Sequence, residues 1–356
     1  MARLTMPNAQ TESKPSSRIV VGGVDTHADT HTVAVVDQVG RRLGCAVFPA
    51  SRAGYRALTG WLAGHGEIYA VGVEGTGSYG AGLTRWLTAH QVRVVEVNRP
   101  NRAERRRRGK SDPVDAEHAA AAVLANTATT IPKARTGLVE SLRLIHATRA
   151  GAVKARTAAR NSFINTLRSS PDAVREALQP LSRARQLKAA AGYRPQGDDP
   201  VATVKRCLRR LAVRITELTA EITAADRDLD RLTQLLAPSM RSRPGFGPET
   251  TAQLLITAGD NPERIGSEAA LAGLCGVSPV QASSGRTRYH RLNRGGDRQA
   301  NRALHMIILN RLRHHQPTRA YLAVHSRDGR ATPHLRRVLK RYLVREVYQL
   351  LSQLQP

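Results

Sequence analysis

Short apolar runs separated by turn residues dominate the chain from residue 19 to about residue 98. The runs read IVVGGVD, THTVAVVD, GCAVFPA, YAVGVEG and VRVVEVN. Two segments, 51–66 and 80–90, instead space their apolar residues like one face of a helix. Hairpin-like strands followed by a strand, a helix and a further strand are typical of a mixed sheet flanked by helices. We therefore predict an α/β domain over residues 19–134, preceded by a flexible polar tail at residues 1–18.

Two of the predicted strands end in a carboxylate, Asp25 in the first run and Glu74 in the fourth. An ionised carboxylate loses solvation inside an apolar sheet unless it is paired or coordinates a cation. The simpler interpretation of Asp25 is a plain hairpin, because Asp and Gly also mark turns. Since the same ending recurs at Glu74, we expect both carboxylates to hold a metal ion.

Two more carboxylates open an Ala-rich helix that is predicted where the chain reads SDPVDAEHAAAAVLAN. Asp112 and Asp115 are three residues apart and would share one face of this helix. They also fit a capping role, with Asp112 as the N-cap and Pro113 as the first helical residue, and the two roles can coexist. Together with Asp25 and Glu74 they form a hard-oxygen site suited to a pair of Mg²⁺ ions.

A basic stretch, RPNRAERRRRGK, stands immediately before that helix. It is either a solvated loop or a segment that contacts nucleic-acid phosphates beside the helix. We favour the second interpretation. The predicted phosphate contacts are Arg105, Arg106, Arg107, Arg108 and Lys110.

Residues 135–238 are predicted to be helical, with a break near PQGDDP at 195–200. After the break, apolar residues recur at alternating spacings of three and four from Leu208 to Leu236, which is typical of a coiled-coil seam. The seam either packs within its own domain or forms a coiled-coil arm that joins protomers. We favour the arm, and therefore a homo-oligomer, either a dimer or a tetramer.

Residues 239–356 are predicted to form a mainly helical domain. It opens with RPGFGPETTAQLL, where Pro and Gly around a short connection between helices let backbone N–H groups approach phosphate. Farther on, ASSGRTRYHRLNRGGDRQ is a polar, basic loop that leads into an amphipathic helix, and its SSG reads by itself as an ordinary turn. The loop supplies arginines for phosphate positioning, namely Arg288, Arg291, Arg294 and Arg298.

The composition indicates a polyanionic partner. Lys and Arg number 55 against 28 Asp and Glu, a net charge of +27 that exceeds what solubility requires. DNA or RNA is the leading partner, and because aromatic residues are only 4% of the chain we expect phosphate contacts rather than base stacking. The three cysteines are scattered, and we find no signal peptide, long apolar run or basic amphipathic anchor. We therefore expect a cytoplasmic protein without a membrane role.

The four carboxylates also carry a resemblance. Asp25, Glu74 and the DxxD of Asp112 and Asp115 resemble the DEDD set of transposases of the insertion-sequence 110 family, relatives of the Piv DNA invertase. PGFGPETTAQLL, GLCGVSPVQASSG and GGDRQANRALH resemble the C-terminal transposase domain of that family. The likeness covers nearly the whole chain from residue 19. It implies an N-terminal RuvC-like domain with the RNase H fold, a helical coiled-coil linker and a mainly α C-terminal domain.

The resemblance also implies a function, DNA transposition or site-specific recombination between donor and target DNA. In that family a Ser in the SG of the C-terminal motif is the nucleophile, which corresponds to Ser284, with Ser283 as the alternative register. Because a Ser hydroxyl needs a base or a metal to attack, we expect the DEDD set of the same or a partner protomer to activate it. Family members also use a structured guide RNA, which the basic surplus permits.

Two other functions remain open. One is a RuvC-type, metal-dependent junction nuclease in which water attacks, and the other is a non-catalytic nucleic-acid-binding protein. His27 and His31 have an HxxxH spacing, but on a strand or turn they would not share a helical face, so neither is assigned to a metal site.

Overall fold

The computed structural model describes residues 18–98, 111–283, 285–286, 290–291, 293–327, 329 and 331–354. It divides the chain into two compact units that meet between Ala134 and Arg135. Residues 1–17 of the predicted tail lie outside the described residues, as do the basic run at 99–110, Ser284 and Arg288. None of the helices in the described ranges combines the length and apolar character of a transmembrane span.

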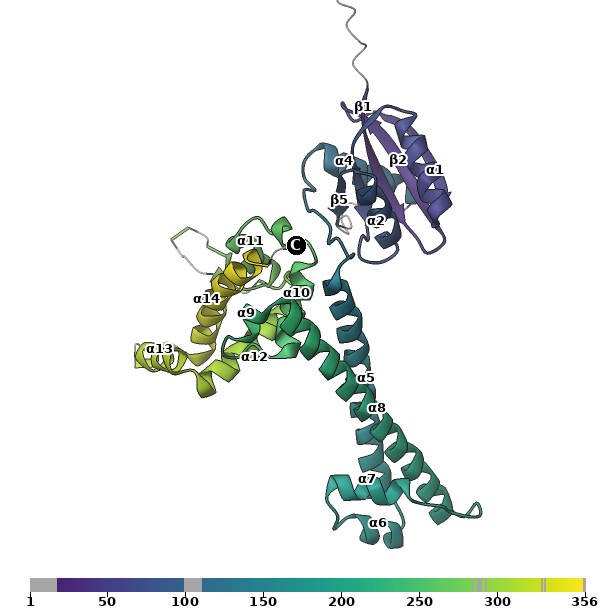
Figure 1. The fold of residues 1–356 in the computed structure, drawn as a ribbon, viewed down its shortest axis with the longest axis vertical. Helices are drawn as coiled ribbons and strands as arrows, with labels where there is room; N and C mark the ends of the chain where they lie inside the picture. The colour runs from purple at the N-terminus through teal and green to yellow at the C-terminus, as the bar shows by residue number, and fades with distance from the viewer. Residues whose placement is uncertain are drawn as a thin grey trace, which may run out of the picture. The chain divides into compact units, whose positions relative to one another are not determined.

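A five-stranded mixed sheet forms the centre of the first unit (Figure 1). The order across the sheet is β3-β2-β1-β4-β5. Strands β1, β2 and β3 form an antiparallel meander, whereas β4 pairs parallel to β1 and β5 pairs parallel to β4. The bounds are β1 Ile19–Thr26, β2 Thr30–Asp37, β3 Arg42–Pro49, β4 Glu67–Glu74 and β5 Val94–Val97.

Helices cover both faces of this sheet, because successive side chains along a strand point to opposite faces. Val20 and Val24 of β1 pack in a core with α1 (Arg52–Ala63) and α2 (Ala81–Ala89). Val21 packs on the other side with the Ala-rich helix α4 (Asp112–Leu124). The predicted α/β organisation is confirmed, and it is compatible with the expected RuvC-like fold.

Two glycines bring α4 unusually close to the sheet. A Cβ atom on Gly23 of β1 would lie 2.1 Å from the carbonyl oxygen of Ala116, and one on Gly72 of β4 would lie 2.7 Å from that of Ala119. Real Cβ atoms do not approach backbone this closely. The backbone of α4 therefore rests directly on β1 and β4, and any larger residue at either glycine would push the helix away.

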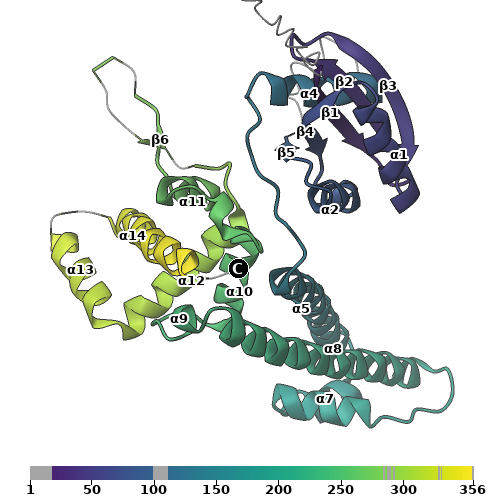
Figure 2. The same ribbon diagram turned by 45° about the horizontal axis from the view of Figure 1, so that its top comes forward.

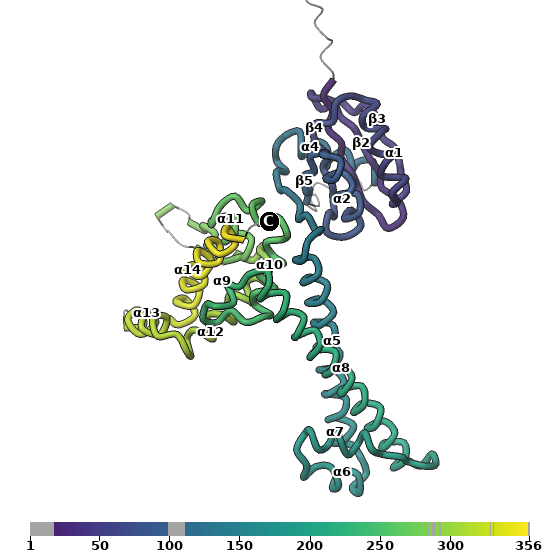
Figure 3. The backbone as a smooth tube through the Cα atoms, in the orientation of Figure 1, coloured from purple at the N-terminus to yellow at the C-terminus, as the bar shows by residue number. Residues whose placement is uncertain are grey.

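A long helical hairpin opens the second unit. Helices α5 and α8 run side by side, joined by two short helices at the far end (Figures 2 and 3). The end of α5 packs on the beginning of α8 in one core, and Leu142 near the start of α5 packs with Leu229 and Leu232 of α8 in another, so the two helices are antiparallel. The bounds are α5 Leu138–Arg168, α6 Asp172–Leu178, α7 Arg183–Ala191 and α8 Pro200–Leu236.

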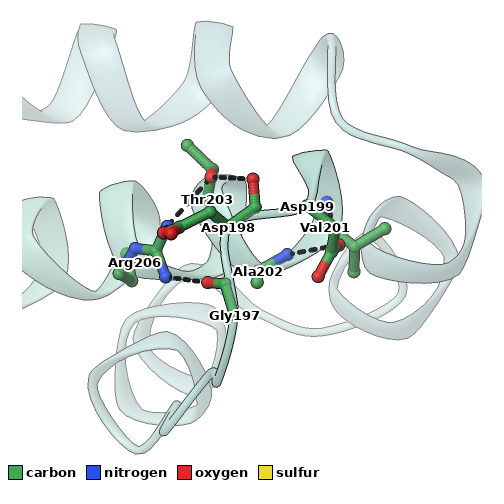
Figure 4. Close-up of polar contacts among 7 residues, drawn as sticks. All are labelled: Gly197, Asp198, Asp199, Val201, Ala202, Thr203 and Arg206. Atoms are coloured by element: carbon green, nitrogen blue, oxygen red, sulfur yellow. Dashed lines mark hydrogen bonds and ion pairs between the residues drawn. The ribbon is translucent and has the colours of Figure 1, made fainter.

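The predicted break at 195–200 is where α8 begins (Figure 4). The Asp199 carboxylate is the N-cap and accepts hydrogen bonds from the backbone N–H groups of Ala202 at 3.0 Å and Val201 at 2.9 Å. These donors lower the pKa of Asp199. Arg206 ties the preceding loop to the first turn of the helix by bonds to the carboxylate of Asp198 at 2.9 Å and to the Gly197 carbonyl.

The seam from Leu208 to Leu236 packs inside the chain. Leu208 and Ile215 are buried with residues of α5, α6 and α7, and Ile222 is also buried. This is the intramolecular arrangement that the heptad pattern left open, and a coiled coil between protomers is not confirmed. The 3.5-residue period of α8 is explained by α5 lying along it, since a buried helix pair needs the same stripe as an oligomer.

The rest of the second unit is a helical bundle on one core, shared with the open end of the hairpin. A two-stranded ribbon of β6 and β7 projects from it (Figure 2). Its helices are α9 Pro238–Arg241, α10 Pro248–Ala258, the 3₁₀ helix Pro262–Arg264, α11 Glu268–Leu274, α12 Arg298–His314, α13 Gln316–Arg327 and α14 Thr332–Ser352. The strands are β6 Val280–Gln281 and β7 His290–Arg291.

Arg311 of α12 fastens the PGFG turn to this bundle. Its Nε donates to the Pro244 carbonyl at 2.8 Å, and its two terminal nitrogens contact Glu346 of α14 at 2.8 and 2.9 Å. Its guanidinium also lies over the ring of Phe246. Because Arg311 is buried and fully engaged, it is a structural cation and not a free phosphate contact.

Candidate active site

Asp25 and Glu74 lie beside each other at the ends of two adjacent parallel strands. Val24 of β1 pairs with Val73 of β4, so the next residues in register are Asp25 and Glu74. Neighbouring strands are about 4.8 Å apart. Thr26 ties the two ends together, because its hydroxyl donates to the Glu74 carbonyl at 2.8 Å. Asp25 and Glu74, which come from two separate apolar runs, therefore occupy neighbouring positions on paired strands.

The face on which these two carboxylates lie is the face that α4 covers. Asp25 follows Gly23 by two residues and Glu74 follows Gly72 by two, so each shares the side of the glycine that contacts α4. Asp115 in the first turn of α4 is also on the buried side, and only 5% of its surface is exposed, against 8% for Asp25 and for Glu74. The three carboxylates are therefore held by the close packing of α4 on the sheet.

The beginning of α4 places Asp112 at this site. Ser111 is the N-cap and the helix begins at Asp112, so the capping interpretation, with Asp112 as the N-cap, is off by one residue. The Ser111 side chain makes no capping hydrogen bond. Two carboxylates in the first turn are favourable in any case, because the N-terminal end of a helix carries a partial positive charge.

His27 joins the carboxylates, which the sequence argument missed. Its Nε2 lies 3.1 Å from Asp25 Oδ2 and 3.5 Å from Asp112 Oδ1. One ligand atom each of Asp25, His27 and Asp112 lie within 4.8 Å of one another, a spacing that could hold a metal ion. The only signal in the sequence is that His27 follows Asp25 in the turn after β1, and that signal is too common to be used alone.

His31, the other member of the HxxxH pair, lies elsewhere. It is buried on β2, its ring stacks on Tyr55 with centroids 5.7 Å apart, and burial lowers its pKa. His31 therefore lies apart from the grouped ligand atoms, whereas His27 belongs to the carboxylate cluster.

The donor set suits a divalent cation. Buried carboxylates are costly without a compensating positive charge, and oxygen ligands at converging positions supply the hard donors that such cations prefer. An imidazole is acceptable to first-row transition metals and is an unusual ligand for Mg²⁺. This cluster could therefore hold a divalent metal, with Asp25, Asp112 and His27 as the residues whose ligand atoms are already grouped.

The ribbon of β6 and β7 carries the predicted serine loop. Val280 pairs with Arg291 and Gln281 with His290, so the SSG segment lies between the two strands. Gly285 has φ +55°, a left-handed conformation that favours glycine, which agrees with a turn at this point. Ser283 is half-buried, and Ser284 is outside the described residues.

Three of the four predicted loop arginines line one cavity of about 740 Å³. Arg291, Arg294 and Arg298 stand on its wall, whereas Arg288 lies outside the described residues. The opposite wall is α14, which sequence reasoning did not assign. The spacing of Arg337 and Lys340 on that helix, three residues apart, was the available signal.

The comparisons with known proteins agree with this arrangement. Residues 22–170 match the family model for the DEDD transposase domain of IS110 elements. Residues 237–323 match the model described as Transposase IS116/IS110/IS902 family. No curated protein matches the chain. The two models cover the carboxylate-bearing sheet and the serine loop in the same order as the motifs, and the chain is therefore a DNA transposase of the IS110 family.

Proposed function

We propose that this transposase exchanges DNA strands through attack of Ser284 on a phosphodiester, assisted by divalent metal at the DEDD set. The observation that supports the proposal is the convergence of carboxylates from β1, β4 and α4 on one face of the sheet, enforced by the glycine contacts of α4. A capping role for Asp112 and Asp115 would involve only α4. A turn role for Asp25 would involve only the hairpin of β1 and β2. Neither role accounts for carboxylates from two strands on the face that α4 covers, with ligand atoms of Asp25, His27 and Asp112 grouped there.

Asp25, Glu74, Asp112 and Asp115 are the residues we propose as ligands, with Mg²⁺, as a pair of ions, the proposed metal. When bound, such ions supply positive charge that stabilises the oxyanions of phosphodiester exchange. His27 holds Asp25 and Asp112 in place by its two close contacts. The protein's own contribution is to fix these groups before DNA binds, so that little reorganisation is needed during reaction.

In the proposed step the oxygen of Ser284 forms a bond to phosphorus while the bond from phosphorus to a deoxyribose oxygen breaks. The hydroxyl proton passes to a base, for which we propose a carboxylate of the DEDD set, and the departing oxygen gains a proton. The product is DNA joined covalently to the chain, which preserves the bond energy for rejoining. Arg105, Arg106, Arg107, Arg108 and Lys110 are proposed to bind phosphates, as are Arg288, Arg291, Arg294 and Arg298.

The partners belong to the same proposal. Donor and target DNA, with a structured guide RNA, would account for a net charge of +27, since each polyanion binds by displacing counterions. A homo-oligomer through the α5–α8 hairpin would bring two sets of carboxylates and serines together. Ile215 and Ile222 are committed to packing within the chain, so the surface to test is the exposed apolar pair Val213 and Leu235 on α8.

The test is a denaturing gel of labelled element-end DNA incubated with the protein, Mg²⁺ and RNA from the adjoining non-coding stretch. We expect a covalent adduct with the unaltered protein, none with Ser284→Ala and none with Asp25→Asn. Asp29→Asn is the matched control, because Asp29 is an exposed carboxylate in the same turn and outside the cluster.

Two outcomes would change the proposal. Cleaved DNA without an adduct would favour the junction nuclease in which water attacks. If Ser283→Ala abolishes the adduct and Ser284→Ala does not, the nucleophile is Ser283.

A further inference from the structure

The cavity beside the serine-bearing ribbon differs from an ordinary basic surface. It is a half-open hollow bordered by the end of α11, the turn before α12, the strand β7 and the face of α14. At about 740 Å³ it is of the size that accommodates a small molecule or one building block of a polymer. Phosphate contacts alone do not require a hollow of this depth, because a duplex backbone binds to a surface.

Cations from four segments face this cavity and almost no anion does. Asp297 is the one acidic residue among the described residues that line it. Both oxygens of Asp297 are used, one accepting from the N–H groups of Gln299 and Ala300 and the other from the Thr257 hydroxyl. The cationic residues of the lining are Arg291, Arg294, Arg298, Arg337, Lys340 and Arg341.

Lys340 is the cation that the fold holds in place. Its Nζ donates to Asn301 Oδ1 at 2.7 Å, and the amide of Asn301 in turn donates to the carbonyls of Cys275 and Gly276. No carboxylate lies within ion-pair distance of Lys340 in the described part of the chain. Burial, and then repulsion from Arg337, lowers the pKa of Lys340. An anion in the cavity would offset both effects, since it would pair with the charged form of Lys340.

Apolar groups complete the lining and point to more than a phosphate. Val277, Pro279, Val338 and Tyr342 are on the walls, and 47% of the Tyr342 surface is exposed. A site that joins apolar walls, an aromatic ring and cations suits a nucleobase with its attached phosphate, because the base contributes a flat apolar face and the phosphate a negative charge.

We propose that this cavity binds one unpaired nucleotide of a nucleic-acid strand, with its phosphate on Lys340 and Arg337 and its base between Val338 and Tyr342. The inference rests on the proposed function, since β7 of the serine-bearing ribbon, at His290 and Arg291, lines the cavity, as does Pro279 directly before β6. A nucleotide that leaves its base stack and binds here would fix the position of the nucleic-acid strand along the second unit. DNA and RNA share this chemistry, and the experiment separates them.

The probe is a duplex with one unpaired 2-aminopurine nucleotide, compared with the same duplex fully paired, each made as DNA and as RNA. The unaltered protein is expected to bind the unpaired form more tightly, with a rise in fluorescence as the base leaves its stack. Arg337→Gln with Lys340→Gln should weaken that binding at least about tenfold. It should also reduce the salt slope of the DNA form by about 0.9, as expected for the loss of one phosphate contact.

A second variant tests the space itself. Val338→Phe narrows the cavity without changing charge, so it should abolish the preference for the unpaired nucleotide and leave binding to the paired duplex and its salt slope unchanged. Arg313→Gln with Arg319→Gln is the charge-matched control, because both are exposed arginines of the same unit outside the cavity. The melting temperature of every variant establishes that it is folded.

The inference is overturned if Val338→Phe keeps the preference, or if the Arg337 and Lys340 variant loses no more affinity than the control. Whichever probe, DNA or RNA, the protein binds more tightly identifies the kind of strand that supplies the nucleotide. Asp25→Asn separates this inference from the proposed function. It should bind the probe normally and form no adduct; an adduct formed by Asp25→Asn would refute the metal-assisted mechanism without touching the cavity.

Discussion

In the first unit, two strand ends and one helix bring carboxylates together, whereas in the second a ribbon, a turn and two helices bring cations together around a cavity. The first arrangement depends on backbone contact, since Gly23 and Gly72 let α4 rest on the sheet. The second depends on long side chains such as Arg298 and Lys340, which reach the cavity from separate elements. Metal ligands on short side chains keep their spacing only if the backbone does not shift. Long Lys and Arg side chains can adjust their conformation to the position of a phosphate.

The largest effect on the second unit is expected at Arg311. Arg311→Met leaves the part-buried Glu346 carboxylate and the Pro244 carbonyl without their donor, at a cost of about 1–3 kcal/mol. Cys275 reports the loss, because it is buried and its pKa is raised to about 12, so it is alkylated only when this unit opens. Mass spectrometry of the alkylated peptide measures the rate.

Arg313→Met is the control for this prediction. Arg313 is exposed on the same helix, so its loss should change stability by less than about 0.5 kcal/mol. Equal protection of Cys275 in both variants would show that the Arg311 contacts do not hold the bundle together.

In the first unit, the packing of α4 on the sheet is tested at Gly23. Gly23→Ala places a methyl group against the backbone of Ala116 and Ala120, so α4 must move, at a cost of about 1–3 kcal/mol. Both tryptophans, Trp61 and Trp86, belong to this unit, so their fluorescence during urea unfolding reports its stability separately.

Gly60→Ala is the opposite change in the same unit. Nothing lies within 4 Å of a Cβ at Gly60, which is inside α1, so alanine should stabilise by about 0.5–1 kcal/mol. A Gly23→Ala variant as stable as the unaltered protein would contradict the close packing of α4, and a destabilised Gly60→Ala would contradict the open space at Gly60.

A smaller effect is expected on metal affinity at His27. His27→Ala removes one grouped ligand atom and the contacts that orient Asp25 and Asp112, which should weaken binding of Mn²⁺ by about tenfold. Isothermal titration of the protein without DNA measures this directly. His314→Ala, at an exposed position in the second unit, should leave the affinity unchanged; a loss there as well would mean that the measured ion binds elsewhere.

The smallest predicted effect is a pH dependence of the first unit through His31. Burial lowers the folded pKa of His31 below 6.5, so the unfolded chain binds more protons in the interval between the two pKa values. Stability therefore falls as the pH drops through 6.5 towards the folded pKa, and the penalty is complete below it. Unfolding followed by tryptophan fluorescence at pH 7.5 and 5.5 should show a weaker dependence for His31→Gln; an unchanged dependence would assign it to other groups.

Much of the first unit could be predicted from local pattern. Val-rich runs ending at Asp25 and Glu74 predicted strands and their polar ends, and Asp112 with Asp115 predicted one helical face. The pattern of α8 predicted less, because the apolar stripe from Leu208 to Leu236 fits packing on a helix of the same chain as well as on another protomer. The periodicity of apolar residues indicates that one face of a helix is buried, but it does not indicate which element covers that face.

The sequence by itself determined which residues carry charge, which segments are strands or helices, and that a DEDD set and a basic loop occur in the order of an IS110 transposase. Only the tertiary structure decided that α4 meets the sheet at Gly23 and Gly72, that His27 joins the carboxylates, and that α14 faces the loop arginines. The physical reason is that periodicity and propensity act over a few neighbouring residues. Contacts between distant segments depend on how whole faces pack, and a single sequence does not state which faces meet.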